Sequence, residues 1–406
     1  ARTGGVGGGT GLIHSLVDWD LNGNLKQRQD LKLSPAVTED FYYDSLNRFD
    51  YSQRTPAGGV TSTNADVTLD AIGNISWKQG IGNYSYHATQ RRAVVSAGGY
   101  SFGYDANGNM TSRNGANIGY TSYNLPNVIN APGGFSSTLS YGAFRNRYKQ
   151  VAIGAQGTET TITVAGLLEK VSNAQGTYYR HYIAGGNGTA AIHSRTASGS
   201  IETYYLHRDH LGSQELITRG NGTQVVRPSY SAYGERRDGA DWDGPISAAD
   251  LATLAGISRR GFTGHEHLDA VNLIHMNGRV YEPIAGRFLS RDPFIDGFAS
   301  SQGMNGYAYV HNNPATWTDP SGFNCSWPSG MSDEEAQAYI TQCEAAFESS
   351  GWGPVGEGNS RYCTLLGMGC PRDQFGQYTE SFFAPGSPDV VSALGRDECL
   401  GAASHP

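Results

Sequence analysis

WDLNGNL at residues 19–25 is the first copy of a motif that returns as YDSLNRF at 43–49, LDAIGNI at 69–75 and YDANGNM at 104–110. Each copy joins a hydrophobic strand end to an aspartate, usually to a Gly-Asn pair, and then to an apolar residue. A fifth stretch, YGAFRNR at 141–147, is a degraded copy with glycine in the place of the aspartate. Repetition of this kind indicates one supersecondary unit used many times.

The aspartates of the four full copies mark the turns of predicted hairpins. They are Asp20, Asp44, Asp70 and Asp105, separated in turn by 24, 26 and 35 residues. The aspartate caps each turn, Gly or Asn adopts the left-handed backbone conformation, and the next residue re-enters the sheet. Alternating stretches such as TETTITVAGLLEKVS at 158–172 turn one face inward. The pattern predicts an all-β chain whose hairpins form a coiled sheet or solenoid.

The composition agrees with many short strands joined by tight turns. The 406 residues include 55 glycines and 24 tyrosines, and only 16% are charged, which is too aromatic and too weakly charged for a disordered chain. A net charge of −8 without a basic run argues against nucleic acid as a partner. No apolar stretch approaches the roughly 20 residues that a membrane helix needs. We therefore expect no nucleic-acid partner, no membrane-spanning segment and no cofactor.

Two longer stretches carry a resemblance to a known family. Residues 204–236 combine a tyrosine-rich strand with HxxHLGS and YxxYGxR patterns, and residues 262–323 contain GRFLSRDP, YAYVHNNP and PATWTDPSG. Together with the aspartate repeats, these motifs resemble the Rhs/YD-repeat family, which includes the C component of Tc toxin complexes. The resemblance covers about residues 17–323. It implies a β-strip that spirals into a partial or complete shell plugged at one end by an Rhs-associated core.

The sequence predicts four segments with different roles. They are a glycine-rich N-terminal lead (1–16), a YD-repeat β-strip (17–203), an Rhs-associated core (204–323) and a variable, cysteine-rich C-terminal segment (324–406). A helical insertion is expected at about 238–260, with Ser247 as N-cap and Gly256 as the stop of a short helix. Because the first strand, near 11–25, would leave an open edge, we expect a protein partner or copies of the chain to complete the shell or a filament.

The C-terminal segment differs in composition from everything before it. All five cysteines lie there, at Cys325, Cys343, Cys363, Cys370 and Cys399. Their clustering favours disulfide bonds in a small, partly helical and otherwise irregular module, with unpaired core cysteines as the alternative. An oxidising compartment and a mainly bacterial family predict a secreted or cell-surface bacterial protein. Because the chain starts at Ala1, we also expect a processed fragment or the tail of a longer polypeptide.

Asp292 in GRFLSRDP and Asp319 in TWTDPSG are the candidate catalytic residues. An aspartic protease needs two carboxyl groups near each other, one to activate water and one to act as an acid. The resemblance implies that such aspartates cut the chain once, after Phe323, and that Arg287 occupies a matching arginine position beside a carboxylate. The alternative is structural, because an aspartate before proline commonly begins a turn without any chemistry.

Histidine and tyrosine clusters offer weaker functional signals. His207, His210, His265 and His267 have spacings that can bind zinc, but hydrogen-bonded structural histidines are the favoured interpretation. Tyrosine pairs such as those at 178–179 and 204–205 are more typical of cross-strand packing, with each hydroxyl in need of a partner, than of sugar binding.

Two functions follow from these features. In the first, the shell encloses or presents a C-terminal polypeptide in toxin delivery or intercellular competition, and cuts itself after Phe323. In the second, the chain is a secreted or surface scaffold that self-assembles without catalysis. Expression of residues 324–406 alone separates the two, because only a toxin should inhibit its host.

Overall fold

The computed structural model describes residues 2–4, 11–143, 145–185, 188–294 and 301–323, all within one compact unit. These residues are almost entirely β-strands and turns, with a single α-helix among them. The predicted all-β fold class is confirmed. The predicted disulfide cysteines and the predicted partly helical module at 324–406 lie outside the described residues.

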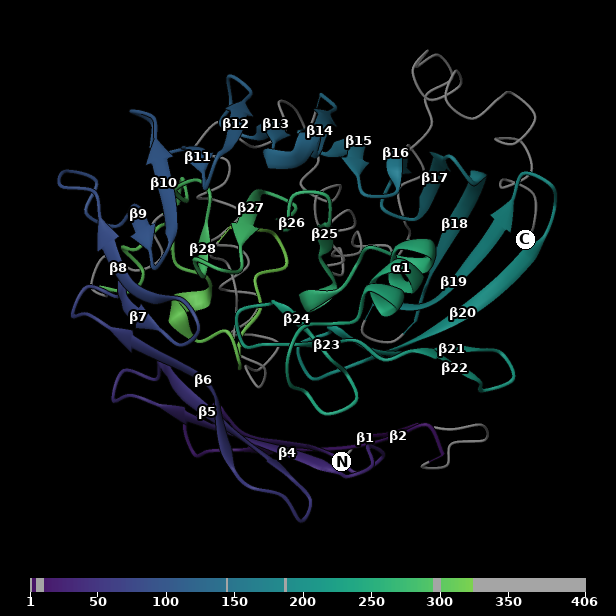
Figure 1. Ribbon diagram of the computed structural model, residues 1–406, viewed down its shortest axis with the longest axis horizontal. Helices are drawn as coiled ribbons and strands as arrows, with labels where there is room; N and C mark the ends of the chain where they lie inside the picture. The colour runs from purple at the N-terminus through teal and green to yellow at the C-terminus, as the bar shows by residue number, and fades with distance from the viewer. Residues whose placement is uncertain (1, 5–10, 144, 186–187, 295–300, 324–406) are drawn as a thin grey trace, which may run out of the picture. The chain divides into compact units, whose positions relative to one another are not determined.

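Twenty-two strands form one continuous strip in which each strand pairs antiparallel with the next strand along the chain. The strands of the strip are β1 (Arg2–Gly4), β2 (Ile13–Trp19), β3 (Leu25–Asp30), β4 (Val37–Tyr43), β5 (Phe49–Pro56), β6 (Ser62–Leu69), β7 (Ile75–Lys78), β8 (Gly82–Tyr86), β9 (Val94–Ala97), β10 (Tyr100–Tyr104), β11 (Met110–Arg113), β12 (Ala116–Tyr120), β13 (Pro126–Asn130), β14 (Ser136–Tyr141), β15 (Arg147–Gly154), β16 (Gly157–Val164), β17 (Leu168–Asn173), β18 (Gly176–Ala184), β19 (Thr189–Thr196), β20 (Ile201–Arg208), β21 (Gln214–Arg219) and β22 (Gln224–Val226). Figure 1 shows the strip curving around the core strands.

The core is built from shorter elements that follow the strip. These are β23 (Ser229–Tyr230), β24 (Arg236–Arg237), α1 (Ala248–Ile257), η3 (Phe262–Gly264), β25 (Glu266–Leu268), β26 (Leu273–Met276), β27 (Arg279–Glu282), β28 (Arg287–Phe288) and η4 (Val310–Asn312), while the single-turn η2 (Pro132–Gly134) belongs to the strip. Strands β25 to β28 form a four-stranded antiparallel sheet.

Two boundaries differ from the predicted segments. Strand β20 pairs with β19, and β21 and β22 follow it, so the strip continues to Val226 although 204–226 was predicted to begin the core. At the other end, β1 pairs with β2, so Arg2–Gly4 covers the edge that was predicted to be open near 11–25. The HLGS stretch is therefore one more hairpin turn of the strip.

The predicted aspartate turns are confirmed, and their geometry is the same in each. At the fourth copy, the Asp105 amide donates to Asn109 O at 2.9 Å, and the Gly108 amide donates to Asp105 O at 3.1 Å. The Asp105 carboxylate accepts the Asn109 amide at 2.8 Å, and Gly108 has φ +85°, the left-handed conformation that glycine adopts without strain. Matching backbone pairs occur at turns that begin at Asp20, Asp44, Asp70, Thr121, Gly142, Asp209 and Ser231.

These turns create β-bulges that explain the curvature of the strip. The register shifts beside the turn in several hairpins, for example between Asp18 and Trp19, and between Gly103 and Tyr104. A bulge bends its strand and increases the local twist. Because the same device recurs along the strip, the bends accumulate in one direction and the sheet coils.

Tyrosines in the strip connect one hairpin to another. In four places a tyrosine hydroxyl of a later strand donates a hydrogen bond to the backbone carbonyl oxygen of the first residue after a turn. The pairs are Tyr43 with Leu25 O (2.8 Å), Tyr86 with Ile75 O (2.8 Å), Tyr120 with Met110 O (2.8 Å) and Tyr141 with Pro126 O (2.7 Å). Each of these four hydroxyls is therefore satisfied by a contact between two hairpins. The cross-strand packing of the pairs at 178–179 and 204–205 stays a prediction.

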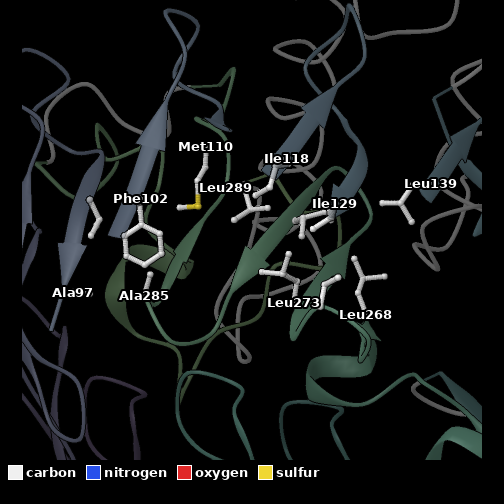
Figure 2. Close-up of a cluster of buried hydrophobic side chains, with 13 residues drawn as sticks. Ala97, Phe102, Met110, Ile118, Ile129, Leu139, Leu268, Leu273, Ala285 and Leu289 are labelled. Atoms are coloured by element: carbon white, nitrogen blue, oxygen red, sulfur yellow. The ribbon is translucent and has the colours of Figure 1, made fainter. Parts of the chain in front are cut away.

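Apolar side chains join the inner face of the strip to the core. Figure 2 shows Phe102, Met110, Ile118 and Ile129 of the strip facing Leu273 and other residues of the core. Full burial of an aliphatic side chain contributes about 1.5–3 kcal/mol. The thirteen buried side chains of this cluster therefore hold the two parts together strongly.

The YAYVHNNP box binds all four predicted repeat turns of the strip. The bonds run from Asn313 Nδ2 to Asn24 Oδ1 (2.9 Å) and Asn47 O (2.8 Å), from Asn312 Nδ2 to Gly73 O (3.2 Å), and from Tyr307 OH to Gly108 O (2.8 Å). The repeat turns are thus both the bends of the strip and the docking points of the core.

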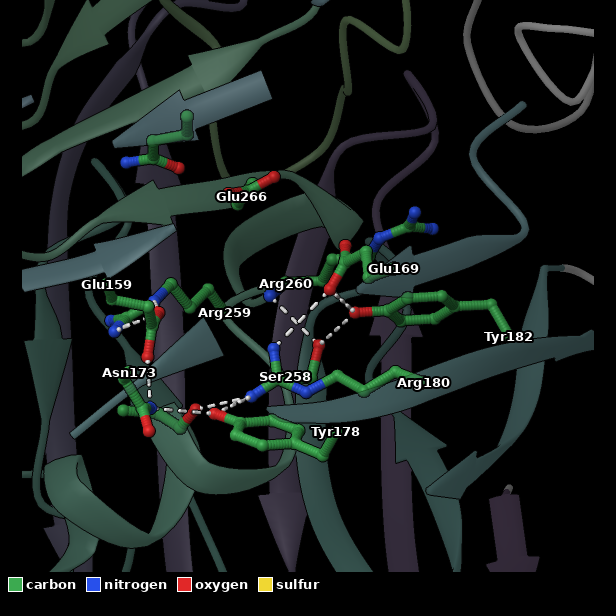
Figure 3. A network of polar contacts seen from close by, with 12 residues as sticks. Glu159, Glu169, Asn173, Tyr178, Arg180, Tyr182, Ser258, Arg259, Arg260 and Glu266 are labelled. Atoms are coloured by element: carbon green, nitrogen blue, oxygen red, sulfur yellow. Dashed lines mark hydrogen bonds and ion pairs between the residues drawn. The ribbon is translucent and has the colours of Figure 1, made fainter. Parts of the chain in front are cut away.

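The helical insertion packs on the inner face of the late strands. Ser247 caps α1 as predicted, with its hydroxyl accepting the Asp250 amide, but the helix passes Gly256 and ends at Ile257. Figure 3 shows a polar network that includes Glu169, Arg180 and Tyr182 of the late strands. Arg180 also donates to Ala255 O of α1 at 2.7 Å. Leu254 and Ile257 join an apolar cluster with the strip. Within the described ranges, no helix is both long and apolar enough to cross a bilayer.

Candidate active site at the end of the core

The two candidate aspartates lie in separate loops of the core and are both buried. Asp292 follows β28, and its amide donates to Gly306 O at 2.8 Å. Asp319 opens the final described turn, and its side chain has no exposed surface. Only 3% of Asp292 is exposed. Two carboxyl groups buried this deeply need charged or hydrogen-bonding partners.

Arg279 of β27 brings the two carboxylates together. Its Nη2 lies 2.8 Å from Asp292 Oδ2 and 3.4 Å from Asp319 Oδ2. Both oxygens therefore contact one nitrogen of one guanidinium group. This geometry places the two predicted aspartates in a single site although 27 residues separate them in the sequence.

The Arg279 side chain is itself fixed on every side. Its Nη1 donates to Gly306 O at 2.8 Å, its Nε donates to Gly322 O, and its Cζ lies 3.5 Å from the centroid of the Phe288 ring. Only 2% of the side chain is exposed. A guanidinium fork held in this way positions its partners with little freedom.

Arg287, which was predicted to clamp a carboxylate, binds elsewhere. Its guanidinium donates to Gly73 O, to Asn312 Oδ1 and to Gly286 O, each at 2.9 Å. Arg287 therefore fastens the core to the third repeat turn, and the cation between the aspartates is Arg279. Both arginines lie in the stretch RVYEPIAGRF at 279–288, and nothing in this local sequence marks Arg279 as the partner of the aspartates.

Asp319 has an unusual environment for a carboxyl group. Its Oδ1 accepts the Gly322 amide at 2.8 Å and lies 3.1 Å from Ser321 Oγ. Burial raises the pKa of Asp319 to about 7; Asp292 acts in the same direction and Arg279 opposes both. A carboxyl group with this pKa is partly protonated at neutral pH and can act as an acid.

The carbonyl group of Phe323 lies beside this carboxyl. Ser321 Oγ lies 2.9 Å from Phe323 O and 3.0 Å from the Phe323 amide nitrogen. Ser321 thus stands between Asp319 and the carbonyl of the predicted cleavage position. Sequence reasoning missed Ser321, because its position within a DPSG turn gives no sign of this contact.

The Phe323 side chain occupies a fitted aromatic site. It is 6% exposed and meets the Phe294 ring edge-on, with 5.5 Å between centroids. Gly278 makes room for it, since a Cβ there would lie 2.2 Å from Phe323 Cε2. The Gly278 amide also donates to Ser321 O at 2.8 Å. The final turn is therefore anchored by backbone and ring contacts next to the aspartates.

The four candidate metal-binding histidines each contact another protein group. His207 lies 3.1 Å from Thr218 Oγ1 and His210 lies 2.9 Å from Ala315 O, while His265 pairs with Thr263 Oγ1 at 2.8 Å. His267 Nε2 accepts the Phe262 amide at 3.1 Å. In the part of the chain that the structure describes, no three His, Cys, Asp or Glu side chains gather as a metal site would require.

Burial favours the neutral form of two of these histidines. It lowers the pKa of His265 to about 4, and it holds the pKa of His267 well below its ordinary value. His265 Nε2 also lies 3.4 Å from Pro320 O, within the turn of Asp319. His265 therefore contacts the turn of Asp319, whereas His267 contacts the backbone of Phe262.

No family model matches the chain. Over 110 residues it is 43% identical to toxin subunit YenC2 of Yersinia entomophaga, covering 27% of this chain and 10% of that subunit. Over 201 residues it is 28% identical to toxin subunit YenC1 of the same organism, covering 46% and 19%. The chain thus spans about a fifth or less of the length of the curated relatives that it matches.

Solved structures of Tc toxins match a larger part of the chain at lower sequence identity. The Photorhabdus luminescens Tc holotoxin pore matches over 79% of this chain and 15% of the compared chain, with 18% identity and a TM-score of 0.49. By sequence the chain is similar to bacterial toxin subunits.

Proposed function

We propose that the core cuts its own chain once, after Phe323, and that the curved strip encloses or presents the polypeptide 324–406 in toxin delivery. The observation that supports the cleavage is the contact of two buried aspartates with one arginine nitrogen, beside the Phe323 carbonyl. A turn alone does not need a buried second carboxylate and a buried guanidinium.

The environments of the two aspartates support a separate role for each. Asp292 makes the closer contact with Arg279, at 2.8 Å, which favours a carboxylate that accepts a proton. Asp319 has the raised pKa, which favours a protonated group that donates one. Asp292 is therefore the general base and Asp319 the general acid of one hydrolysis.

The reaction balances with water as the second reactant. Asp292 takes a proton from water, whose oxygen bonds to the Phe323 carbonyl carbon, and the Asp319 proton passes to the carbonyl oxygen. The tetrahedral intermediate then collapses as the bond to the Asn324 nitrogen breaks. Asp292 gives its proton to that nitrogen, and a hydroxyl proton returns to Asp319. The products are a Phe323 carboxyl group and an Asn324 amino group.

Cleavage should slow at alkaline pH. The active form carries a proton on Asp319, and the pKa of this carboxyl is about 7. Above that value the protonated fraction, and with it the rate, should fall by about tenfold per pH unit. Pulse-labelled chain from cell-free synthesis, chased in buffers from pH 6 to 9, measures this. A rate that rises through pH 8 and 9 would assign Asp319 the role of base.

The Asn variants of the two aspartates test the cleavage itself. Asp292→Asn and Asp319→Asn should each slow the appearance of fragments by about 10²–10⁴-fold, because each removes a proton-transfer group. Asp243→Asn is the control, since Asp243 is 59% exposed and binds Arg54 far from the site in sequence. Fragments that form equally fast in all three variants would leave the aspartates as turn residues.

The relatives bear on the wider role. They are named as toxin subunits, which favours enclosure or presentation of a toxin segment over a scaffold without catalysis. We propose that the chain acts at a secreted or cell-surface location, with a protein partner or further copies of itself completing the shell. Residues 324–406, expressed alone in a host cytosol, should then inhibit growth, and harmless expression would contradict the toxin role.

A further inference from the structure

We infer that Ser321 is a further catalytic residue whose hydroxyl carries the proton of Asp319 to the carbonyl oxygen of Phe323. The inference rests on the proposed cleavage after Phe323 and adds a step to it. It assigns a chemical role to the residue between the proline and the glycine of the DPSG turn.

The first support is geometric. Ser321 Oγ lies 3.1 Å from Asp319 Oδ1 and 2.9 Å from Phe323 O. Both distances are those of ordinary hydrogen bonds. One hydroxyl therefore bridges the acidic oxygen and the carbonyl that must gain a proton.

The second support is the count of hydrogens. A serine hydroxyl has one hydrogen to donate and two lone pairs that accept. One lone pair of Ser321 receives the Phe323 amide at 3.0 Å. If Asp319 is protonated, it donates to the other lone pair, and the hydroxyl hydrogen is left for Phe323 O. The one hydrogen and both lone pairs of the Ser321 hydroxyl then each have a partner.

Ionised Asp319 changes this arrangement. The Ser321 hydroxyl then has two acceptors, the carboxylate and the Phe323 carbonyl, but only one hydrogen. A hydrogen bond to the charged carboxylate is the stronger of the two, so the carbonyl loses its donor. The protonation state of Asp319 thereby decides whether the Phe323 carbonyl is polarised.

The third support is the position of the other Asp319 oxygen. Oδ2 faces the Arg279 guanidinium, which has hydrogens to donate and cannot accept one. A proton on Asp319 therefore resides on Oδ1, the oxygen that faces Ser321. The Gly322 amide, at 2.8 Å from the same Oδ1, holds the carboxyl in this orientation.

The transfer conserves atoms and charge. As water attacks, the Ser321 hydroxyl hydrogen moves to Phe323 O, and the Asp319 hydrogen moves to Ser321 Oγ. The new bond is O–H on the tetrahedral carbon, and Asp319 is left as a carboxylate. Collapse of the intermediate reverses both transfers, so Ser321 and Asp319 regain their hydrogens and no other reactant is needed.

Ser321→Ala and Ser321→Thr test the relay in the full chain. Ser321→Ala should slow cleavage by about 10²–10³-fold, as expected for loss of one donor to a reacting carbonyl. Ser321→Thr keeps the hydroxyl and should stay within about tenfold of the wild type. In Ser321→Ala the remaining rate should also lose its decline above pH 7, because Asp319 no longer reaches the carbonyl. If Ser321 only supports the turn, Ser321→Ala should slow cleavage but keep the fall of the cleavage rate above pH 7.

The outcomes separate this inference from the proposed function. If the wild type stays whole, the cleavage proposal fails. If the wild type is cut and Ser321→Ala matches its rate and pH profile, only the relay fails. Should Ser321→Ala not fold, as judged by tryptophan fluorescence, Ser321→Cys preserves the volume with a weak donor. A folded Ser321→Cys chain cut at the wild-type rate would also overturn the relay.

Discussion

Arg279→Met should abolish cleavage and leave the folded core much less stable. Arg279 is buried and contacts Asp292 at 2.8 Å and Asp319 at 3.4 Å. Its removal leaves two buried carboxyl groups without their shared cation. Loss of one partner from a buried ion pair costs about 3–5 kcal/mol, because the remaining charge has no compensation.

The matched control neutralises all three charges. The triple variant Arg279→Met, Asp292→Asn, Asp319→Asn should be more stable than Arg279→Met by about 3–5 kcal/mol, since no uncompensated charge remains. Neither chain should be cut, so urea denaturation compares two intact proteins. Equal stability of the two would show that Arg279 does not hold the aspartates as described.

Arg279→Lys refines the same point. A lysine keeps the charge but cannot form the guanidinium fork that contacts both carboxylates and two backbone carbonyls. The variant should fold, yet its cleavage should remain slow. Cleavage at the wild-type rate would show that only the charge matters, and not the shape of the cation.

Gly322→Ala should have the second large effect, by displacing the Phe323 carbonyl. Gly322 has φ +75°, and a Cβ there would lie 1.8 Å from Met276 O, a backbone atom that cannot move aside easily. The turn from Asp319 to Phe323 must therefore shift as a whole. A displacement of about 1 Å is enough to slow a reaction strongly when it depends on the alignment of the reacting carbonyl with its proton donor. The chain should stay whole in intact-mass spectra.

Gly23→Ala separates this clash from ordinary backbone strain. Gly23 has nearly the same φ, +79°, but no atom of another residue lies within 4 Å of the position that the new methyl group would take. The substitution should cost about 1 kcal/mol through its left-handed backbone alone and leave cleavage unchanged. If Gly23→Ala also prevented cleavage, the effect of Gly322→Ala would reflect stability and not the position of Phe323.

The repeat turns were predictable from the sequence because their chemistry is local. An aspartate and a following Gly or Asn determine a turn within five residues, as Asp105 and Gly108 show. The N-cap of α1 was predictable for the same reason, because Ser247 accepts the amide of Asp250, only three residues away. The direction in which the strip coils, and its continuation to Val226, depend on bulges summed over many hairpins, which no single motif displays.

The candidate site was predictable only in part. Asp292 and Asp319 stood out by motifs that resemble those of the Rhs/YD-repeat family, but the choice between Arg279 and Arg287 required the three-dimensional structure. Arg279 faces the aspartates from β27, whereas Arg287 faces Gly73 in a turn more than 200 residues away. Long-range contacts of this kind leave no periodic signal in the sequence.

Ser321 illustrates a second reason why the sequence predicted only part of the candidate site. Its neighbours Asp319 and Phe323 are only two residues away, so the contact is local, yet its meaning depends on the burial that raises the pKa of Asp319. Burial comes from the surrounding core, in which Arg279 of β27 lies 3.4 Å from Asp319 Oδ2. A local motif thus acquires its chemistry from distant packing.

The intact mass of the purified wild-type chain tests the central claim most directly. The proposed mechanism predicts two species, one ending at Phe323 and one beginning at Asn324, while Asp319→Asn gives a single full-length mass under the same conditions. A wild-type chain that remains a single full-length species at pH 6 to 7, where Asp319 holds its proton, would contradict self-cleavage and leave Asp319 as the first residue of a buried turn.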